Sequence, residues 1–114
     1  MKIWVDGSSK GNPGPAKARA VFESGEHFTE DLGTTTNNRA EYQALILGLK
    51  AASKKGIVEL TVLTDSMLIN GHLNKGWKVY ENSDLIKEAR AWLKKFKRCE
   101  IIWIPREENK AHED

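Results

Sequence analysis

The spacing of hydrophobic and polar residues changes along the chain, and each change predicts a different element of secondary structure. Residues 2–5, 18–22 and 26–32 carry apolar and β-branched side chains typical of strands, and turn residues separate the three stretches. From 38 to 54, apolar and small residues recur every three or four positions, which predicts an amphipathic helix. Two lysines and Gly56 then supply a helix stop. The first half therefore predicts an antiparallel meander of three strands followed by a helix.

The second half of the chain continues with alternating strands and helices. Residues 58–63 form a nearly continuous apolar run, which is typical of a buried strand in parallel pairing. A short helix is expected over 66–73, a longer one capped by Ser83 or Asp84, and a last strand over 99–104. On the longer helix, the residues expected to face a core are Leu85, Ala89, Trp92 and Phe96. This order predicts a single α/β domain over residues 1–114, with helices on the faces of a mixed sheet.

The composition narrows the class of protein. The chain has 114 residues, and 18 basic against 16 acidic residues give a formal net charge of +2, which permits nucleic-acid binding without requiring it. Cys99 is the single cysteine, so the chain has neither an internal disulfide nor a cysteine cluster for zinc. No apolar run approaches the roughly 18 residues of a membrane span, and the first residues lack a signal-peptide pattern. We therefore expect a cytoplasmic protein that is not associated with a membrane.

Four acidic positions stand out because of where the predicted elements place them. They are Asp6 at the end of the first strand, Glu41 in the first turn of the long helix, Asp65 at the end of the fourth strand, and Glu113 or Asp114 at the end of the chain. The carboxyl ends of neighbouring parallel strands meet at one edge of an α/β sheet, so Asp6 and Asp65 should emerge side by side. Glu41 would join them if the start of its helix leans over that edge.

Each of these acids also has a purely structural interpretation. Glu41 could complete a capping box with Asn38, and Asp65 could cap the helix that follows it. Asp6 precedes a glycine in a common turn pair, and acidic residues at a chain end are usually solvated. A cluster of acids nevertheless needs a reason, because neighbouring carboxylates raise one another's pKa.

Hard divalent cations supply such a reason. Mg²⁺ takes oxygen ligands and is bound by one or two carboxylates together with substrate phosphates. Two such ions about 4 Å apart would activate an attacking water and stabilise the leaving oxygen of a phosphodiester. The three histidines match no ligand spacing, and we expect surface positions rather than metal ligation for His27, His72 and His112.

Four segments, in this order, resemble type 1 ribonucleases H: "DGSSKGNPGPA", "TTTNNRAEYQAL", "LTDS" and "IPREENKAHED". The resemblance spans nearly the whole chain and implies a ribonuclease H-like fold, with a five-stranded mixed sheet whose fourth and fifth strands run parallel to the first. It also implies an endoribonuclease that hydrolyses the RNA strand of RNA–DNA hybrids and leaves 5′-phosphate and 3′-hydroxyl ends. The implied cofactor is Mg²⁺ or Mn²⁺, with two ions per site when substrate is bound, and the implied state is a monomer.

By position, the resemblance assigns roles to individual residues. The metal-binding carboxylates of the family are matched by Asp6, Glu41, Asp65 and either Asp114 or Glu113. The residues that resemble minor-groove contacts are Gly11, Asn12, Asn37 and Asn38, and those that resemble a pocket for a DNA phosphate are Thr36 and Asn82. Arg106 resembles an arginine that some relatives carry in place of a flexible-loop histidine. More modest alternatives stay open, because Asn37 or Asn38 could only cap the helix and Asn82 could only shape a turn.

The sequence departs from the family pattern after the third carboxylate. Only "NKGWKVYEN" lies between Leu73 and Ser83, so the basic protrusion of many members is absent or reduced. Lys75, Trp77 and Lys78 could supply a reduced substitute. Trp77 could stack on a sugar or base, and it could equally serve ordinary packing.

A second departure is at the carboxyl end. Family members usually continue through a helix that carries the fourth carboxylate, whereas this sequence stops at Asp114. The usual spacing from Asn109 selects Glu113, and the usual residue type, aspartate, selects Asp114. We expect a domain without the C-terminal helix, and the sequence leaves open whether it is a natural minimal form or a shortened chain.

Three functions are compatible with these features. They are an active ribonuclease H, a non-catalytic nucleic-acid-binding module of the same fold, and another metal-dependent phosphoryl-transfer enzyme. Asp6, Glu41 and Asp65 argue against the binding module, because a pure binder has no need of clustered negative charge. The asparagines around the site favour a duplex substrate over a small molecule, although fold analogy alone would not decide between them.

Overall fold

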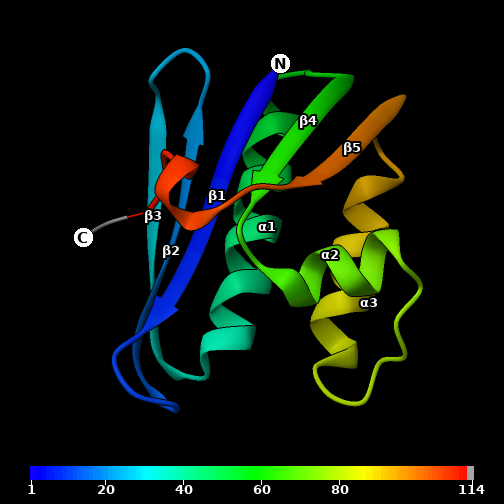
Figure 1. The fold of residues 1–114 in the computed structure, drawn as a ribbon. Helices are drawn as coiled ribbons and strands as arrows, with labels where there is room; N and C mark the ends of the chain where they lie inside the picture. Colours follow the sequence, from blue (N-terminus) through cyan, green and yellow to red (C-terminus); the bar gives the residue numbers. More distant parts are fainter. Residues whose placement is uncertain (113–114) are drawn as a thin grey trace.

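The computed structural model describes residues 1–112, which fold around one five-stranded mixed sheet (Figure 1). The strands lie in the order β3-β2-β1-β4-β5. Their bounds are Lys2–Ser9 for β1, Gly14–Phe22 for β2, His27–Thr35 for β3, Glu59–Thr64 for β4 and Arg98–Trp103 for β5. The first three strands pair antiparallel, β4 runs parallel to β1, and β5 runs parallel to β4. The expected sheet, a meander extended by two parallel strands, is confirmed.

The three α-helices of the described chain are α1 (Asn37–Lys54), α2 (Met67–Asn74) and α3 (Ser83–Leu93). α1 runs along one face of the sheet and α3 packs against α1 (Figure 1). α2 lies on the same side, because His72 on α2 and Tyr42 on α1 share a hydrogen bond. The opposite face is crossed by the residues after β5, which include a short 3₁₀ turn. Within residues 1–112, the α-helices therefore cover one face of the sheet, although the sequence had predicted helices on its faces.

The core forms where α1 meets β1. Ile3 and Val5 on β1 are fully buried against the helix. A Cβ atom at Gly48 of α1 would lie 2.8 Å from Cδ1 of Ile3 and 3.0 Å from Cγ1 of Val5, so the missing side chain lets the helix lie close to the sheet. The other large, fully buried side chains are Phe22, Tyr42, Leu45, Leu49, Val62, Ile69 and Ile86. They come from the sheet and from all three α-helices, so one core joins them.

The sequence had suggested that Asp6 ends the first strand, but Asp6 lies inside β1. β4 pairs with β1 only as far as Val5, whose partner is Thr64, whereas β2 continues to pair with β1 through Ser9. Asp6 is therefore the first residue beyond the parallel part of the sheet, although the strand itself continues.

The boundaries of α3 also differ from the prediction. Its N-cap is Asn82, and not Ser83 or Asp84. Phe96 follows the helix instead of lying on it, yet it is only 8% exposed because the chain turns back toward the core before entering β5. No helix within residues 1–112 is both long enough and apolar enough to cross a lipid bilayer.

Candidate active site

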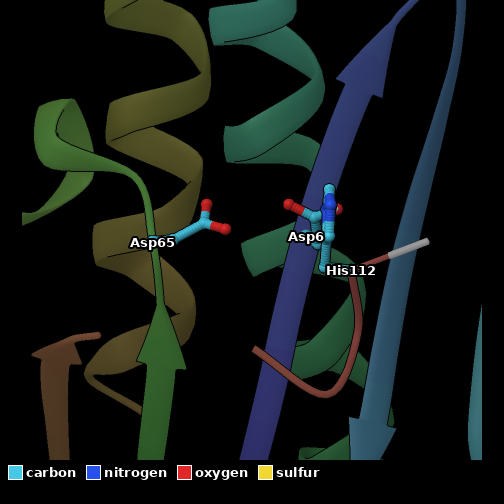
Figure 2. Close-up of side chains that lie close together, drawn as sticks. All are labelled: Asp6, Asp65 and His112. Atoms are coloured by element: carbon cyan, nitrogen blue, oxygen red, sulfur yellow. The ribbon is translucent and has the colours of Figure 1, made fainter. Parts of the chain in front are cut away.

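Two carboxylates meet at the C-terminal ends of the parallel strands. Because Val5 pairs with Thr64, the next residues, Asp6 within β1 and Asp65 just after β4, lie at the same level where the parallel pairing ends. Figure 2 shows Asp65 directed toward the strand that carries Asp6. The side chain of Asp6 is 13% exposed and that of Asp65 is 8% exposed. Together with His112, each could offer one ligand atom within 4.8 Å of the others.

Glu41 reaches this edge because α1 touches β1 at a glycine. A Cβ atom at Gly7 would lie 2.0 Å from the carbonyl oxygen of Ala40 and 2.5 Å from the backbone nitrogen of Glu41. Only a residue without a side chain permits so close an approach of strand and helix. No local sequence pattern reveals this contact of Gly7, since its partner is a helix that begins some thirty residues later.

The structural interpretations of Glu41 and Asp65 do not apply. The N-cap of α1 is Thr36, so Asn38 lies within the helix and forms no capping box with Glu41. The N-cap of α2 is Ser66, whose hydroxyl accepts from the backbone N–H of Ile69, so Asp65 is not the cap either. Both carboxylates are therefore available for another role.

Asp65 holds a buried oxygen that accepts no hydrogen bond from any residue in the range 1–112. This atom, Oδ2, lies 3.9 Å from Nε of Arg106, beyond hydrogen-bond distance. The backbone carbonyl of Asp65 accepts from Nε1 of Trp103 at 3.2 Å, which fixes the chain at this point. Buried polar atoms are nearly always satisfied in proteins. An unsatisfied carboxylate oxygen beside a second carboxylate fits a site for a divalent cation.

Burial and mutual repulsion raise the pKa values of two of the acids. The pKa of Glu41 is raised to about 7, first by burial and then by the charge of Asp65, while a hydrogen bond from Ser66 partly offsets the rise. The pKa of Asp6 is raised to about 6, again by burial and then by Asp65, and His112 partly offsets it. Without a cation, these groups are therefore partly protonated near neutral pH. A bound cation would favour their charged forms.

The segment after β5 brings two residues to the site that the sequence analysis did not place there. Asn109 is buried, its Nδ2 donates to the carbonyl oxygen of Val5 at 2.9 Å, and its Oδ1 accepts from the backbone N–H of Ala111 at 3.0 Å. His112 then lies with Nδ1 3.5 Å from Oδ2 of Asp6 (Figure 2). No sequence signal could reveal the Asn109 contact, because its partner lies at the opposite end of the chain.

The expectation that His72 is a surface residue is wrong. His72 is 6% exposed, and its Nδ1 lies 2.7 Å from the hydroxyl oxygen of Tyr42. The two rings are also stacked. A histidine on the apolar face of a short helix is buried here because the tyrosine hydroxyl supplies a polar partner, which the local pattern does not reveal.

The expected minor-groove residues are brought together at the start of α1. Oδ1 of Asn12 accepts from the backbone N–H of Asn37 at 3.0 Å, which ties the turn between β1 and β2 to the helix. Asn12 and Asn38 are exposed. Gly11 has a φ of 103°, a conformation that suits glycine. Asn37, Asn38 and Glu41 lie on the first two turns of α1, and the turn that carries Gly11 and Asn12 is tied to them.

The other expected substrate residues lie at the starts of α1 and α3 and in the segment between α2 and α3. Thr36 caps α1, and Asn82 has a left-handed φ of 61° at the N-cap of α3. Trp77 packs over α2, where a Cβ atom at Gly71 would lie 2.0 Å from its ring, yet 44% of Trp77 is exposed. Trp77 and Asn82 line a hollow of about 430 Å³ together with Asn38. Packing of Trp77 is thus observed, and its exposed part leaves room for stacking.

The remaining predicted residues are near the C-terminus. Arg106 is 71% exposed and approaches Asp65 from the solvent side. Glu113 and Asp114, the two candidates for the fourth carboxylate, lie outside the described residues.

This combination of sheet and site defines a class of protein. The strand order β3-β2-β1-β4-β5, with β1, β4 and β5 parallel and acids at their carboxyl edge, is the ribonuclease H-like fold. The family described as reverse transcriptase-like matches residues 5–113. The chain belongs to the ribonuclease H family, and the resemblance seen in the sequence is confirmed.

Individual relatives agree with this assignment. The N-terminal RNase H domain of Rv2228c from Mycobacterium tuberculosis has a TM-score of 0.88 and 38% identity, over 95% of this chain and 84% of that chain. Ribonuclease HI from Halobacterium salinarum is 36% identical over 117 residues, which cover 96% of this chain and 58% of that protein. LC11-RNase H1 in complex with an RNA/DNA hybrid has a TM-score of 0.85 and 31% identity, over 96% of this chain and 88% of that chain. The chain spans 33% of the whole bifunctional protein Rv2228c.

Gly7→Ala should weaken both the fold and the acidic site. The new methyl group would meet the Ala40 carbonyl, so the start of α1 must move away from β1 and carry Glu41 with it. We expect the free energy of unfolding to fall by about 1–3 kcal/mol and the Mg²⁺-dependent rise in melting temperature to shrink. Gly56→Ala is the control, because its φ of 76° strains a side chain but nothing lies within 4 Å. An unchanged response of Gly7→Ala to Mg²⁺ would contradict the role of this contact.

The raised pKa of Glu41 predicts how the stability of the metal-free protein changes with pH. Because the folded protein binds this proton more tightly than the unfolded chain, the contribution of Glu41 to stability is full below about pH 4 and is lost as the pH rises through about 7. Glu41→Gln should therefore be more stable than the parent at pH 8, by about 1–3 kcal/mol, and no more stable at pH 4. Urea unfolding in EDTA at both pH values measures this. A difference that is the same at both would rule out the titration of Glu41 as its cause.

Proposed function

We propose that the chain is a divalent-metal-dependent endoribonuclease that hydrolyses the RNA strand of RNA–DNA hybrids and leaves 5′-phosphate and 3′-hydroxyl ends. The observation that carries the proposal is the unsatisfied, buried Oδ2 of Asp65 beside Asp6 at the edge of the parallel strands. A structural relative, LC11-RNase H1, has been solved in complex with an RNA/DNA hybrid, which supports the choice of substrate.

The residues present suit a hard cation. Asp6, Glu41 and Asp65 offer carboxylate oxygens, the ligands that Mg²⁺ and Mn²⁺ prefer. Two such ions, bound together with substrate, would supply activation of the attacking water and stabilisation of the leaving oxygen. The raised pKa values of Asp6 and Glu41 agree with this role, since carboxylates that repel one another gain most from a cation.

The chain's own side chains would orient the RNA strand. The guanidinium of Arg106 is exposed and lies 3.9 Å from Asp65, where it can approach the negative charge of the phosphodiester. All of the proposed site residues come from one chain, so a monomer suffices.

Selectivity for a hybrid would come from the polar groups at the start of α1. Oδ1 of Asn12 is occupied by the backbone N–H of Asn37, so its –NH₂ group is the part left to donate outward. Hybrid duplexes present 2′-hydroxyls of the RNA strand in a wide, shallow minor groove, which short amide side chains can reach. Thr36 and Asn82 would hold a phosphate of the DNA strand, and the exposed part of Trp77 could stack nearby.

A cleavage assay with three duplexes tests the proposal. Labelled hybrid, duplex RNA and duplex DNA are incubated with the protein, with and without Mg²⁺. We expect cleavage of the RNA strand of the hybrid only, and only with the cation. Binding of the hybrid without cleavage would instead identify a non-catalytic module. Hydrolysis confined to small phosphate esters would identify a different phosphoryl-transfer enzyme.

Asp65→Asn should abolish cleavage and leave the fold intact. The substitution removes a metal ligand and also relieves repulsion with Asp6 and Glu41, so the melting temperature without metal should not fall. Hybrid binding in Ca²⁺ should persist or weaken modestly. Glu100→Gln, an exposed acid on β5, is the control and should cleave like the parent. Activity of Asp65→Asn within tenfold of the parent would contradict the metal-ligand assignment.

The carboxyl end offers two neighbouring acids for one role. We expect only one of the two, Glu113 or Asp114, to serve as the fourth metal ligand. We expect Asp114→Asn to lower activity or raise the Mg²⁺ concentration required, because its side chain length is the usual one at this position. Glu113→Gln should behave like the parent. A Mg²⁺ titration of both variants decides between the two, and parental behaviour of both would mean that three carboxylates suffice.

A further inference from the structure

Arg39 lies between the two residues that the proposed function assigns to a DNA phosphate. It sits in the first turn of α1, where its backbone N–H donates to Oγ1 of Thr36 at 3.3 Å. Its guanidinium reaches the start of α3, where Nη1 donates to Oδ1 of Asn82 at 3.1 Å. Thr36 and Asn82 are far apart in the sequence, and this one residue contacts both.

These contacts decide which atoms of Asn82 and Thr36 face outward. A guanidinium can only donate, so the atom of Asn82 that faces Arg39 must be the amide oxygen, and the –NH₂ group lies on the other side of the planar amide. The hydroxyl oxygen of Thr36 accepts from Arg39, which leaves its proton to be donated elsewhere. Both side chains thus present donors, and a phosphate oxygen accepts hydrogen bonds.

Asp84 holds the guanidinium in a fixed plane. Nη1 of Arg39 donates to Oδ1 of Asp84 at 3.1 Å, and Nη2 donates to Oδ2 at 2.8 Å. These hydrogen bonds lower the pKa of Asp84 to about 2, because they stabilise the charged carboxylate. The paired bonds define the direction from which Nη1 approaches Asn82. Asn82 itself has a left-handed φ of 61°, a conformation that asparagine adopts more readily than most residues other than glycine.

The stability of the fold does not explain why Arg39 is paired with Asp84. The side chain of Asp84 is 64% exposed and that of Arg39 is 31% exposed, and exposed ion pairs contribute little to folding. A second pair, Lys50 with Glu88 at 3.6 Å, joins the same two helices about three turns further along α1. It bridges α1 and α3 away from Thr36 and Asn82, and so provides a matched control.

We propose that Arg39 is a positioning residue for hybrid binding, whose guanidinium turns the amide of Asn82 so that its –NH₂ group donates, beside the hydroxyl of the N-cap Thr36, to one phosphate of the DNA strand. This inference rests on the proposed function and adds a residue to which the sequence analysis gave no role. The Arg39 side chain acts through Asn82 and does not itself contact the phosphate.

A double-mutant cycle tests this role. Hybrid affinity is measured by fluorescence anisotropy, with Ca²⁺ in place of Mg²⁺, for Arg39→Lys, Asn82→Ala and the double variant. Lysine keeps a cation beside Asp84, but its single ammonium group cannot hold two partners in one plane. Each single variant should weaken binding about two- to tenfold, as expected for one hydrogen bond. The double variant should be no weaker than the weaker single variant, and Lys50→Gln should bind like the parent.

Two results would overturn the role of Arg39. One is parental affinity of Arg39→Lys, and the other is a double variant whose loss equals the product of the two single losses. A second variant keeps the test decisive if Arg39→Lys fails to fold. Asn82→Asp retains the acceptor for Arg39 but turns a carboxylate oxygen outward, so it should bind hybrid more weakly than Asn82→Ala. Equal or tighter binding of Asn82→Asp would also overturn the proposal.

The cleavage assay on the parent separates this inference from the proposed function. A parent that binds hybrid but does not cleave it in Mg²⁺ contradicts the proposed activity, while the binding cycle still measures the coupling between Arg39 and Asn82. A parent that cleaves normally while the cycle shows independent losses contradicts only the role of Arg39.

Discussion

The close approach of β1 and α1 is the contact on which the whole site depends. At Gly7 the strand touches the backbone at Ala40, and further along the helix Gly48 gives room to the apolar side chains of the same strand. Because the glycine at each contact has no side chain, the helix lies close to the strand at both points. The start of the helix therefore carries Glu41 to the edge where Asp6 lies. The close packing of α1 on β1 thus forms the core and also places the acidic side chains.

The acidic site works against the stability of the metal-free fold. Burial raises the pKa values of Asp6 and Glu41, and Oδ2 of Asp65 has no hydrogen-bond partner within residues 1–112. A folded domain keeps such a cluster only where many surrounding contacts fix the positions of the side chains. Here the parallel register aligns the two aspartates, and the buried amide of Asn109 ties the last segment to the carbonyl of Val5.

Residues proposed for recognition and for chemistry lie on successive turns of α1. The first turn of α1 carries Asn37, the exposed Asn38 and the Arg39 contacts, and the next turn carries Glu41. The hydrogen bond between Arg39 on α1 and Asp84 on α3 holds the start of α3 beside the start of α1. A nucleic acid held by these groups would lie against the acidic edge without any movement of the domain, since the elements involved share one core.

The sequence by itself predicted the order and type of the strands and α-helices, because hydrophobic period and turn chemistry are local properties of the chain. It also singled out Asp6, Glu41 and Asp65 as candidates for the site. It also determined the family, because four segments carry specific residues in a specific order. Only the tertiary structure decided that Asp6 lies within a strand, that His72 is buried against Tyr42, and that Asn109 reaches Val5. Each of these depends on a partner distant in sequence, and a pattern read over a few residues holds no information about which distant groups the fold brings into contact.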